Sequence, residues 1–111
     1  MLLRENLQQL IGNGVLALME NPDQMEKLHR NPEIIKPAVE ELLRYTSPVL
    51  MTTERYAREN ISLHGITVPQ GEMTLGVIGS ANRDEKVFAK PDELDLTEIT
   101  SITRLKFGSN R

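Results

Sequence analysis

The stretch "VEELLRY" at residues 39–45 sets a glutamate, Glu41, three positions before an arginine, Arg44, in a run typical of a short helix. A helical wheel places five residues of this region on one apolar arc: Ala38, Val39, Leu42, Leu43 and Tyr45. Glu41 flanks that arc, Arg44 lies opposite it, and Glu40 stands at the better i,i+4 spacing from Arg44. From the pattern alone this is a solvated face, on which such a pair contributes about 0.3–0.5 kcal/mol.

Helical patterns also precede this stretch. An apolar stripe at three- and four-residue steps predicts a helix over residues 2–20. Gly12 and Gly14 interrupt it, so either another element passes close by or the helix is simply weak. "NPDQ" at 21–24 and "NPE" at 31–33 each combine an asparagine N-cap with a proline at the first helical position. They predict a helix over 22–29, a helical turn over 32–36 and, because Pro37 interrupts it, a new helix over 37–45.

The period changes from 3.6 to 2 on the C-terminal side. Residues 61–63 and 66–68 predict a hairpin through His64-Gly65, with 73–77 and 51–57 as further strands of a small antiparallel sheet. Ser80 is expected to cap a helical turn at "ANRDE". The predicted class is therefore α+β, in one partial domain over residues 1–111. Helices occupy 1–47, the small sheet 48–79, and a helical turn with an irregular meander 80–111.

Composition excludes several classes of function. A formal charge of −3 with scattered basic residues gives no reason to expect nucleic acid. The absence of cysteine excludes disulfides, zinc-thiolate sites, cysteine nucleophiles and a thiolate ligand from these residues. His29 and His64 stand apart from other ligands, which argues against a metal site. No signal peptide or membrane span is evident, and a cytoplasmic location is expected.

Five segments in order resemble the bacterial cytochrome P450 family: "VEELLRYTSPV", "TTERYA", "HGITVPQGE", "GSANRDEKVFAKPDELDL" and "FGSNR". The match runs from about Ile11 through Asp95 and implies a partial cytochrome P450 fold. It also implies that Glu41 and Arg44 are the family's helix-K Glu-x-x-Arg pair, which is buried near the proximal side of the haem. On this hypothesis the wheel shows a polar face because the part of the protein that covers it lies outside the chain. The pair is then expected to behave here as an exposed one.

The resemblance implies roles for further positions. Arg55 matches the arginine that pairs with a haem propionate, where a guanidinium can donate two parallel hydrogen bonds. Without the family context Arg55 is an ordinary charge at a strand edge. Three residues match the substrate-pocket segment after helix K: Val49, Leu50 and Thr52. Two match the start of the haem-binding loop: Phe107 and Gly108.

The sequence also departs from the family pattern. Glu5 and Asn6 fall where the family carries an acid and a threonine for oxygen activation, so the hydroxyl is missing. In the family a third arginine normally joins the Glu-Arg pair from the region that "PDELDLTE" matches, and Glu93 and Glu98 stand at the two corresponding places here. Counted forward from Phe107, the family's haem-ligating cysteine would fall three positions past the last residue.

These features predict a fragment of a haem-thiolate monooxygenase, inactive by itself because the cysteine loop is missing. The intact relative would bind haem, take electrons from a ferredoxin- or flavodoxin-type redox partner and oxidise a small organic substrate with O2. The alternative is a non-catalytic remnant that acts as a small protein-interaction module. Exposed apolar surface on the first helix and on the strands is expected to favour self-association.

Overall fold

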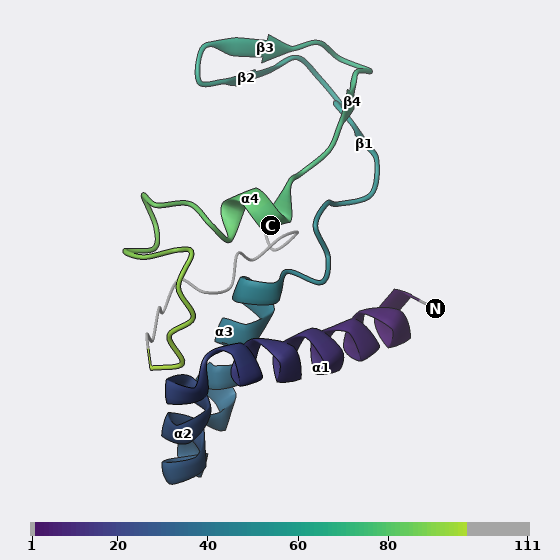
Figure 1. Ribbon diagram of the computed structural model, residues 1–111. Coiled ribbons are helices and arrows are strands. Elements are labelled where there is room, and N and C mark those ends of the chain that lie inside the picture. The colour runs from purple at the N-terminus through teal and green to yellow at the C-terminus, as the bar shows by residue number, and fades with distance from the viewer. Residues whose placement is uncertain (1, 98–111) are drawn as a thin grey trace.

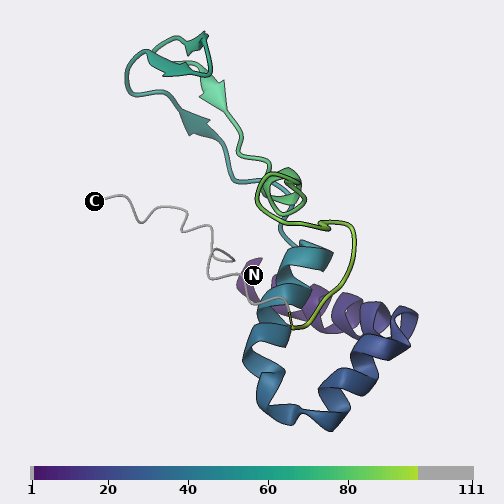
Figure 2. The same cartoon turned by 90° about the vertical axis from the view of Figure 1, so that its left-hand side faces the viewer.

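The chain is elongated. The computed structural model describes residues 2–97, in which a group of helices lies at one end and a β-hairpin projects at the other (Figures 1 and 2). The molecule measures 52 × 33 × 26 Å, with a radius of gyration of 16.5 Å. A compact domain of 100 residues has a radius of gyration of about 13 Å. The chain therefore buries less of itself than an independent domain of its length.

Four helical elements form the N-terminal half, as predicted: α1 (Leu2–Glu20), α2 (Pro22–Arg30), the 3-10 turn η1 (Pro32–Ile34) and α3 (Ile35–Thr46). The predicted break at Pro37 is wrong, because α3 already begins at Ile35. Pro37 thus lies in the first turn, where a backbone N–H has no partner within the helix and its loss is tolerated. Within residues 2–97 no helix is long and apolar enough to cross a membrane.

The asparagines predicted as N-caps act on the preceding helix instead. Asn21 and Asn31 do occupy the N-cap positions, but neither side chain caps the helix that follows. The Asn21 side-chain amide donates to the Ala17 carbonyl at 2.9 Å, and that of Asn31 donates to the Lys27 carbonyl at 3.2 Å. Each therefore satisfies a carbonyl at the C-terminal end of a helix, one of the groups left without an intrahelical partner.

The two glycines of α1 differ in their surroundings. Gly14 is buried on the side of α1 that packs on α3, and a Cβ added there would lie 3.7 Å from Leu42 Cδ1. A Cβ added at Gly12 would meet no atom within 4 Å. The close approach considered from the sequence therefore exists at Gly14 only, and even there it is an ordinary van der Waals contact.

The β-structure consists of two separate antiparallel ladders rather than one four-stranded sheet. The strands are β1 (Arg55–Tyr56), β2 (Ile61–Leu63), β3 (Ile66–Val68) and β4 (Met73–Thr74), with β1 paired to β4 and β2 to β3. The hairpin prediction is confirmed. Its two turn residues, His64 and Gly65, have φ of 49° and 82°, as a two-residue type I′ turn requires. The predicted strand over 73–77 is interrupted after Thr74, and Val77 forms only an isolated bridge with Met51.

The short helix α4 (Ile78–Ala81) lies earlier than predicted. Its N-cap position is Val77, so Ser80 is inside the helix and does not cap a turn at 81–85. Residues 82–97 instead form irregular turns that run back to the helices, as Figure 1 shows.

The core forms where this returning segment meets α1 and α3. Its buried residues are Ala17, Ala38, Leu94 and Leu96, and Leu96 is fully buried. The Leu96 amide donates to Oε1 of the buried Gln24 at 2.9 Å, which satisfies both polar groups in the interior. Residues 94–96 therefore complete a core that the helices alone do not close.

Candidate functional site

The Glu41–Arg44 pair is buried. The two side chains are 4% and 2% exposed, whereas Val39 and Leu43 on the same helix are 38% and 37% exposed. The buried residues of α3 are Ala38, Glu41 and Arg44, which follow one another at three-residue spacing along one face. The helix thus turns the Glu41–Arg44 pair inward, while Val39 and Leu43 of its apolar arc lie at the surface.

Arg44 has an acceptor for each of its five N–H groups. Its Nε and Nη2 donate to the two carboxylate oxygens of Glu41 at 2.7 and 2.9 Å, in bidentate geometry. Nη2 also donates to the Glu93 carbonyl at 2.9 Å, and Nη1 donates to the carbonyls of Asn82 (2.9 Å) and Pro91 (2.7 Å). A buried guanidinium is tolerated because all of its donors are satisfied.

Two further contacts enclose the pair. Glu41 Oε2 accepts a hydrogen bond from the Asp95 backbone amide at 3.0 Å. The buried ring of Phe88 lies with its centroid 5.0 Å from Arg44 Cζ, within the range of a cation–π contact. Among residues 2–97 no buried side-chain nitrogen or oxygen lacks a partner. The network joins α3 to residues 82–95 through both terminal nitrogens of the guanidinium and through Glu41 Oε2.

The expectation of an exposed pair is therefore wrong. The cover was expected to lie outside the chain, but residues 82, 88, 91, 93 and 95 of the chain itself supply it. A helical wheel shows only the spacing of residues within one helix. It carries no information on a segment 38 to 54 residues away that folds back over the polar face.

The third arginine expected beside this pair has no counterpart within the described residues. Glu93, one of the two positions considered, approaches Arg44 through its backbone carbonyl, while its carboxylate lies 3.9 Å from the exposed Lys90. Glu98, the other position, lies outside the described residues. Backbone carbonyls thus stand around Arg44 in this segment, and a carbonyl accepts from arginine without adding a charge.

A second arginine that joins α3 to the returning segment, Arg83, was not predicted from the sequence. Arg83 donates through Nη2 to the Tyr45 carbonyl at 2.8 Å and through Nη1 to Asp92 Oδ1 at 2.9 Å. Its Cζ lies 4.8 Å from the centroid of the Tyr45 ring. Arg83 therefore fixes the C-terminal end of α3 to the returning segment. The only signal in the sequence was "ANRDE", which was interpreted as a helical turn.

The three residues assigned to a substrate pocket lie together between α3 and β1. Val49 and Leu50 are exposed, and Thr52 is half-buried. The Thr52 amide donates to the Gly76 carbonyl at 2.8 Å, and the Leu50 carbonyl accepts from the Gly79 amide at 3.0 Å. The segment is thus held along its backbone while its side chains remain accessible.

Arg55 stands in β1 opposite Thr74 and is exposed. No hydrogen bond or ion pair of its guanidinium occurs within residues 2–97, although its carbonyl accepts weakly from Thr74 Oγ1 at 3.3 Å. A guanidinium in this state is able to bind an external carboxylate. Phe107 and Gly108, assigned to the haem loop, lie outside the described residues.

The remaining candidates show no assembled site. Glu5 is exposed and Asn6 half-buried on α1. His29 is exposed in the last turn of α2, and His64 occupies the hairpin turn. No group of three or more His, Cys, Asp or Glu side chains within residues 2–97 is arranged to hold a metal ion.

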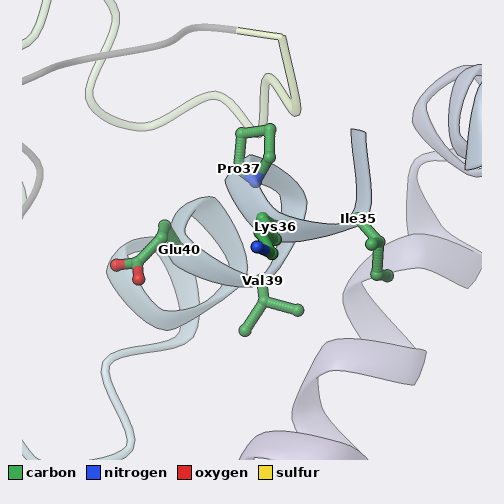
Figure 3. Close-up of a pocket in the computed structure, with 5 residues that line it drawn as sticks. All are labelled: Ile35, Lys36, Pro37, Val39 and Glu40. Carbon is green, nitrogen blue, oxygen red and sulfur yellow. The ribbon is translucent and has the colours of Figure 1, made fainter. Parts of the chain in front are cut away.

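One surface depression adjoins α3 (Figure 3). It has a volume of about 460 Å³ and is lined by five residues: Ile35, Lys36, Pro37, Val39 and Glu40. All of them come from the first half of a single helix, and their side chains spread in different directions. None is a residue assigned to a site above. The depression is therefore a feature of the helix surface and not the pocket indicated by residues 49–52.

Known proteins resemble this chain over most of its length. The family model described as "Cytochrome P450" matches residues 3–98. The biotin biosynthesis cytochrome P450 of Bacillus subtilis is 45% identical over 94% of this chain and 26% of its own length. The vitamin D(3) 25-hydroxylase of Pseudonocardia autotrophica is 44% identical over 87% of this chain and 24% of its own length.

Solved structures show the same likeness. The structure of P450BioI in complex with an acyl carrier protein ligated to hexadec-9Z-enoic acid has a TM-score of 0.80 and 47% identity. The match covers 84% of this chain and 24% of that one. The ligand-free monooxygenase TamI gives a TM-score of 0.83 at 38% identity, over 86% of this chain and 24% of its own. The chain spans about a quarter of the length of the relatives it matches, and its fold is a partial one. With the family model, the identities and the folds in agreement, this chain belongs to the cytochrome P450 family.

Proposed function

We propose that this chain is the core-locking part of a haem-thiolate monooxygenase. The observation that carries the proposal is the fully satisfied Glu41–Arg44 network, which ties α3 to residues 82–95. A buried ion pair contributes little net stability compared with apolar packing. The role proposed for this pair is to specify one arrangement of the segments that it joins. In the whole protein this arrangement would place the pocket segment and Arg55 at fixed positions relative to the haem.

The described residues fit the rim of a haem and not its iron. The exposed guanidinium of Arg55 suits a propionate carboxylate. Phe107 and Gly108, which lie outside the described residues, would begin the haem-binding loop. Bound haem supplies the redox chemistry by which O2 oxidises the substrate. No cysteine is present in the 111 residues, so the thiolate ligand has to come from outside them. These residues by themselves are accordingly not expected to oxidise a substrate.

The substrate is proposed only as a small organic molecule that contacts Val49, Leu50 and Thr52. The relatives carry names that refer to biotin biosynthesis, vitamin D(3) and 6-deoxyerythronolide B, at 41–45% identity to this chain. Unrelated substrates thus accompany almost equal similarity. The whole protein would take electrons from a ferredoxin- or flavodoxin-type partner, in the cytoplasm, with no role for nucleic acid.

A haem titration tests the proposal. The purified chain is titrated with haem, reduced and exposed to carbon monoxide, and the Soret band is recorded. A thiolate-type band from the 111 residues would contradict the assignment of the iron ligand to another part of the protein. The expected result is weak or no binding, and Arg55→Ala should weaken any haem association that is seen. Arg58→Ala, an exposed arginine outside the strands, is the matched control.

A further inference from the structure

Two stretches of the chain, 45–52 and 76–83, run antiparallel beside each other between α3 and the ladders (Figures 1 and 2). Their contacts follow antiparallel order along both stretches, with the pairing shifted by no more than one residue. Five contacts join them: Tyr45 O with Arg83 Nη2, Ser47 Oγ with Asn82 Nδ2, Leu50 O with Gly79 N, Met51 with Val77, and Thr52 N with Gly76 O. The second stretch therefore acts as a support along the whole pocket segment.

Two glycines of the supporting stretch face two residues of the pocket segment. A Cβ added at Gly79 would lie 2.9 Å from Leu50 Cδ2, which is closer than real Cβ atoms approach. A Cβ added at Gly76 would lie 3.0 Å from Thr52 Cγ2 and 3.4 Å from Thr52 Oγ1. The side chains of Leu50 and Thr52 thus occupy the space that side chains at 79 and 76 would take.

Backbone conformation does not require glycine at these two positions. Within residues 2–97 the glycines with positive φ are Gly65 and Gly71. Gly76 and Gly79 have backbone angles open to any residue. An added methyl at position 79 or 76 would instead contact the facing side chain of the pocket segment. This contact is the physical reason for a glycine at each position.

We propose that Gly79 and Gly76 are positioning residues that set the side-chain conformations of Leu50 and Thr52. The proposal rests on the proposed function, in which these two side chains line the substrate pocket. With glycine at 79, Leu50 lies back against the supporting stretch. With a larger residue there, Leu50 has to turn toward its open side, since it is 60% exposed, and would narrow the pocket.

The backbone hydrogen bonds make the side chain the part that moves. The Leu50 carbonyl is held by the Gly79 amide at 3.0 Å, and the Thr52 amide is held by the Gly76 carbonyl at 2.8 Å. A leucine terminus rotates between staggered conformers without breaking either bond. Thr52 is more restricted, because its Oγ1 accepts from the Gly76 amide at 2.8 Å and rotation about χ1 removes that bond.

The first test uses methyl NMR on the full 111-residue chain, without haem or substrate. Gly79→Ala is expected to shift the Leu50 methyl carbons, which report the χ2 rotamer, while amide signals outside 45–52 and 76–83 keep their positions. Gly12→Ala is the matched control, since its Cβ meets nothing within 4 Å, and it should leave Leu50 unchanged. Unchanged Leu50 methyl signals in Gly79→Ala, or an equal shift in the control, would overturn the proposal.

A double-variant comparison covers the case in which Gly79→Ala unfolds the chain. If the methyl acts through Leu50, its effect on the urea midpoint should largely disappear in a Leu50→Ala background. An effect of the same size in both backgrounds overturns the proposal, whether or not the single variant folds. At Gly76 the facing residue is Thr52. Thr52→Ser removes Cγ2 and keeps the hydroxyl, so it should reverse the loss of stability that Gly76→Ala causes. Failure of that rescue excludes the role of Gly76.

These measurements separate the inference from the proposed function. Leu50 methyl signals depend only on packing between the two stretches. If they move as expected while the haem titration gives a thiolate-type complex, the positioning role stands and the assignment of the iron ligand fails. If they do not move, the positioning role fails whatever the titration shows.

Discussion

The surroundings of Arg44 and the β2–β3 hairpin are opposite in character. Arg44 is a charged group inside the chain, with every donor paired. The hairpin pairs Ile61 with Val68 and Leu63 with Ile66, which puts four aliphatic side chains on one face. Three of these four are exposed, and Ile66 is 70% exposed. The chain thus buries a charge and leaves an aliphatic surface open.

The difference shows what decides burial in this chain. Arg44 is covered because residues 82–95 fold back onto α3, and these residues belong to the chain. Nothing within residues 2–97 covers the aliphatic face of the hairpin, or Ile11 and Met19 of α1, each 65% exposed. In a protein four times as long, the other parts of the fold are the natural cover for such surfaces.

Removing the Arg44 side chain should give the largest effect. Arg44→Ala leaves the Glu41 carboxylate buried and three carbonyls unpaired, so we expect a loss of about 3–5 kcal/mol in the free energy of unfolding. Urea unfolding followed by circular dichroism measures it. An exposed pair would lose only about 1 kcal/mol or less on the same substitution.

Arg30→Ala is the matched control, because Arg30 pairs with Glu26 at i,i+4 spacing with both side chains largely exposed. It should cost about 0.3–0.5 kcal/mol. If Arg44→Ala has no folded baseline, Arg44→Lys can be compared with Arg30→Lys, since an ammonium offers three donors to five acceptors. Equal effects at positions 44 and 30 would show that the Glu41–Arg44 pair contributes no more than an exposed pair.

Truncating one leucine in each region should give the next largest difference. Leu96 is fully buried, and Leu96→Ala should destabilise the chain by about 2–5 kcal/mol through lost burial and a cavity. Leu63 is 56% exposed in the hairpin, and Leu63→Ala should cost roughly 1 kcal/mol or less. Thermal or urea midpoints measure both. A larger effect at Leu63 would show that the hairpin face is covered in solution, by another copy or by residues past 97.

A substitution that strains the hairpin turn tests whether the hairpin unfolds independently of the core. Gly65 has φ of +82°, so Gly65→Ala should introduce about 1–2 kcal/mol of strain. We expect hydrogen exchange to accelerate in β2 and β3 while the amides of α3 keep their protection. Gly12→Ala, in an open helical position, should instead stabilise the chain by up to about 1 kcal/mol. Loss of protection in α3 would mean that the two regions unfold as one unit.

The smallest effect on stability, and the clearest on association, should come from the hairpin surface. Ile66→Ser should reduce both hydrophobic-dye fluorescence and self-association while moving the urea midpoint little, because the side chain is already 70% exposed. Thr67→Ser, on the opposite face of the hairpin, is the control. Light scattering across a concentration series measures association. A monodisperse, dye-silent parent chain would instead indicate a self-sufficient domain.

Local patterns predicted much of the fold. The α1 stripe, the prolines at 22 and 32 and the His64-Gly65 turn each act within a few residues, and these elements occur where expected. The errors concern groups with more than one possible partner. Asn21 was assigned to the following helix but bonds to the preceding one, and Ser80 was assigned a capping role although the helix already starts before it. An amide or a hydroxyl does not specify which neighbour it will bind.

The sequence by itself determined the family, the helices and the hairpin, because motif order and side-chain period are properties of the chain read locally. Tertiary structure alone decided that Glu41 and Arg44 are buried, that Arg83 clamps Tyr45 and that Gly79 leaves room for Leu50. Each of these depends on contacts between residues 29 to 54 positions apart. The periodicity of one helix cannot show such contacts, since the burial of a polar face depends on which distant backbone carbonyls come to meet its donors.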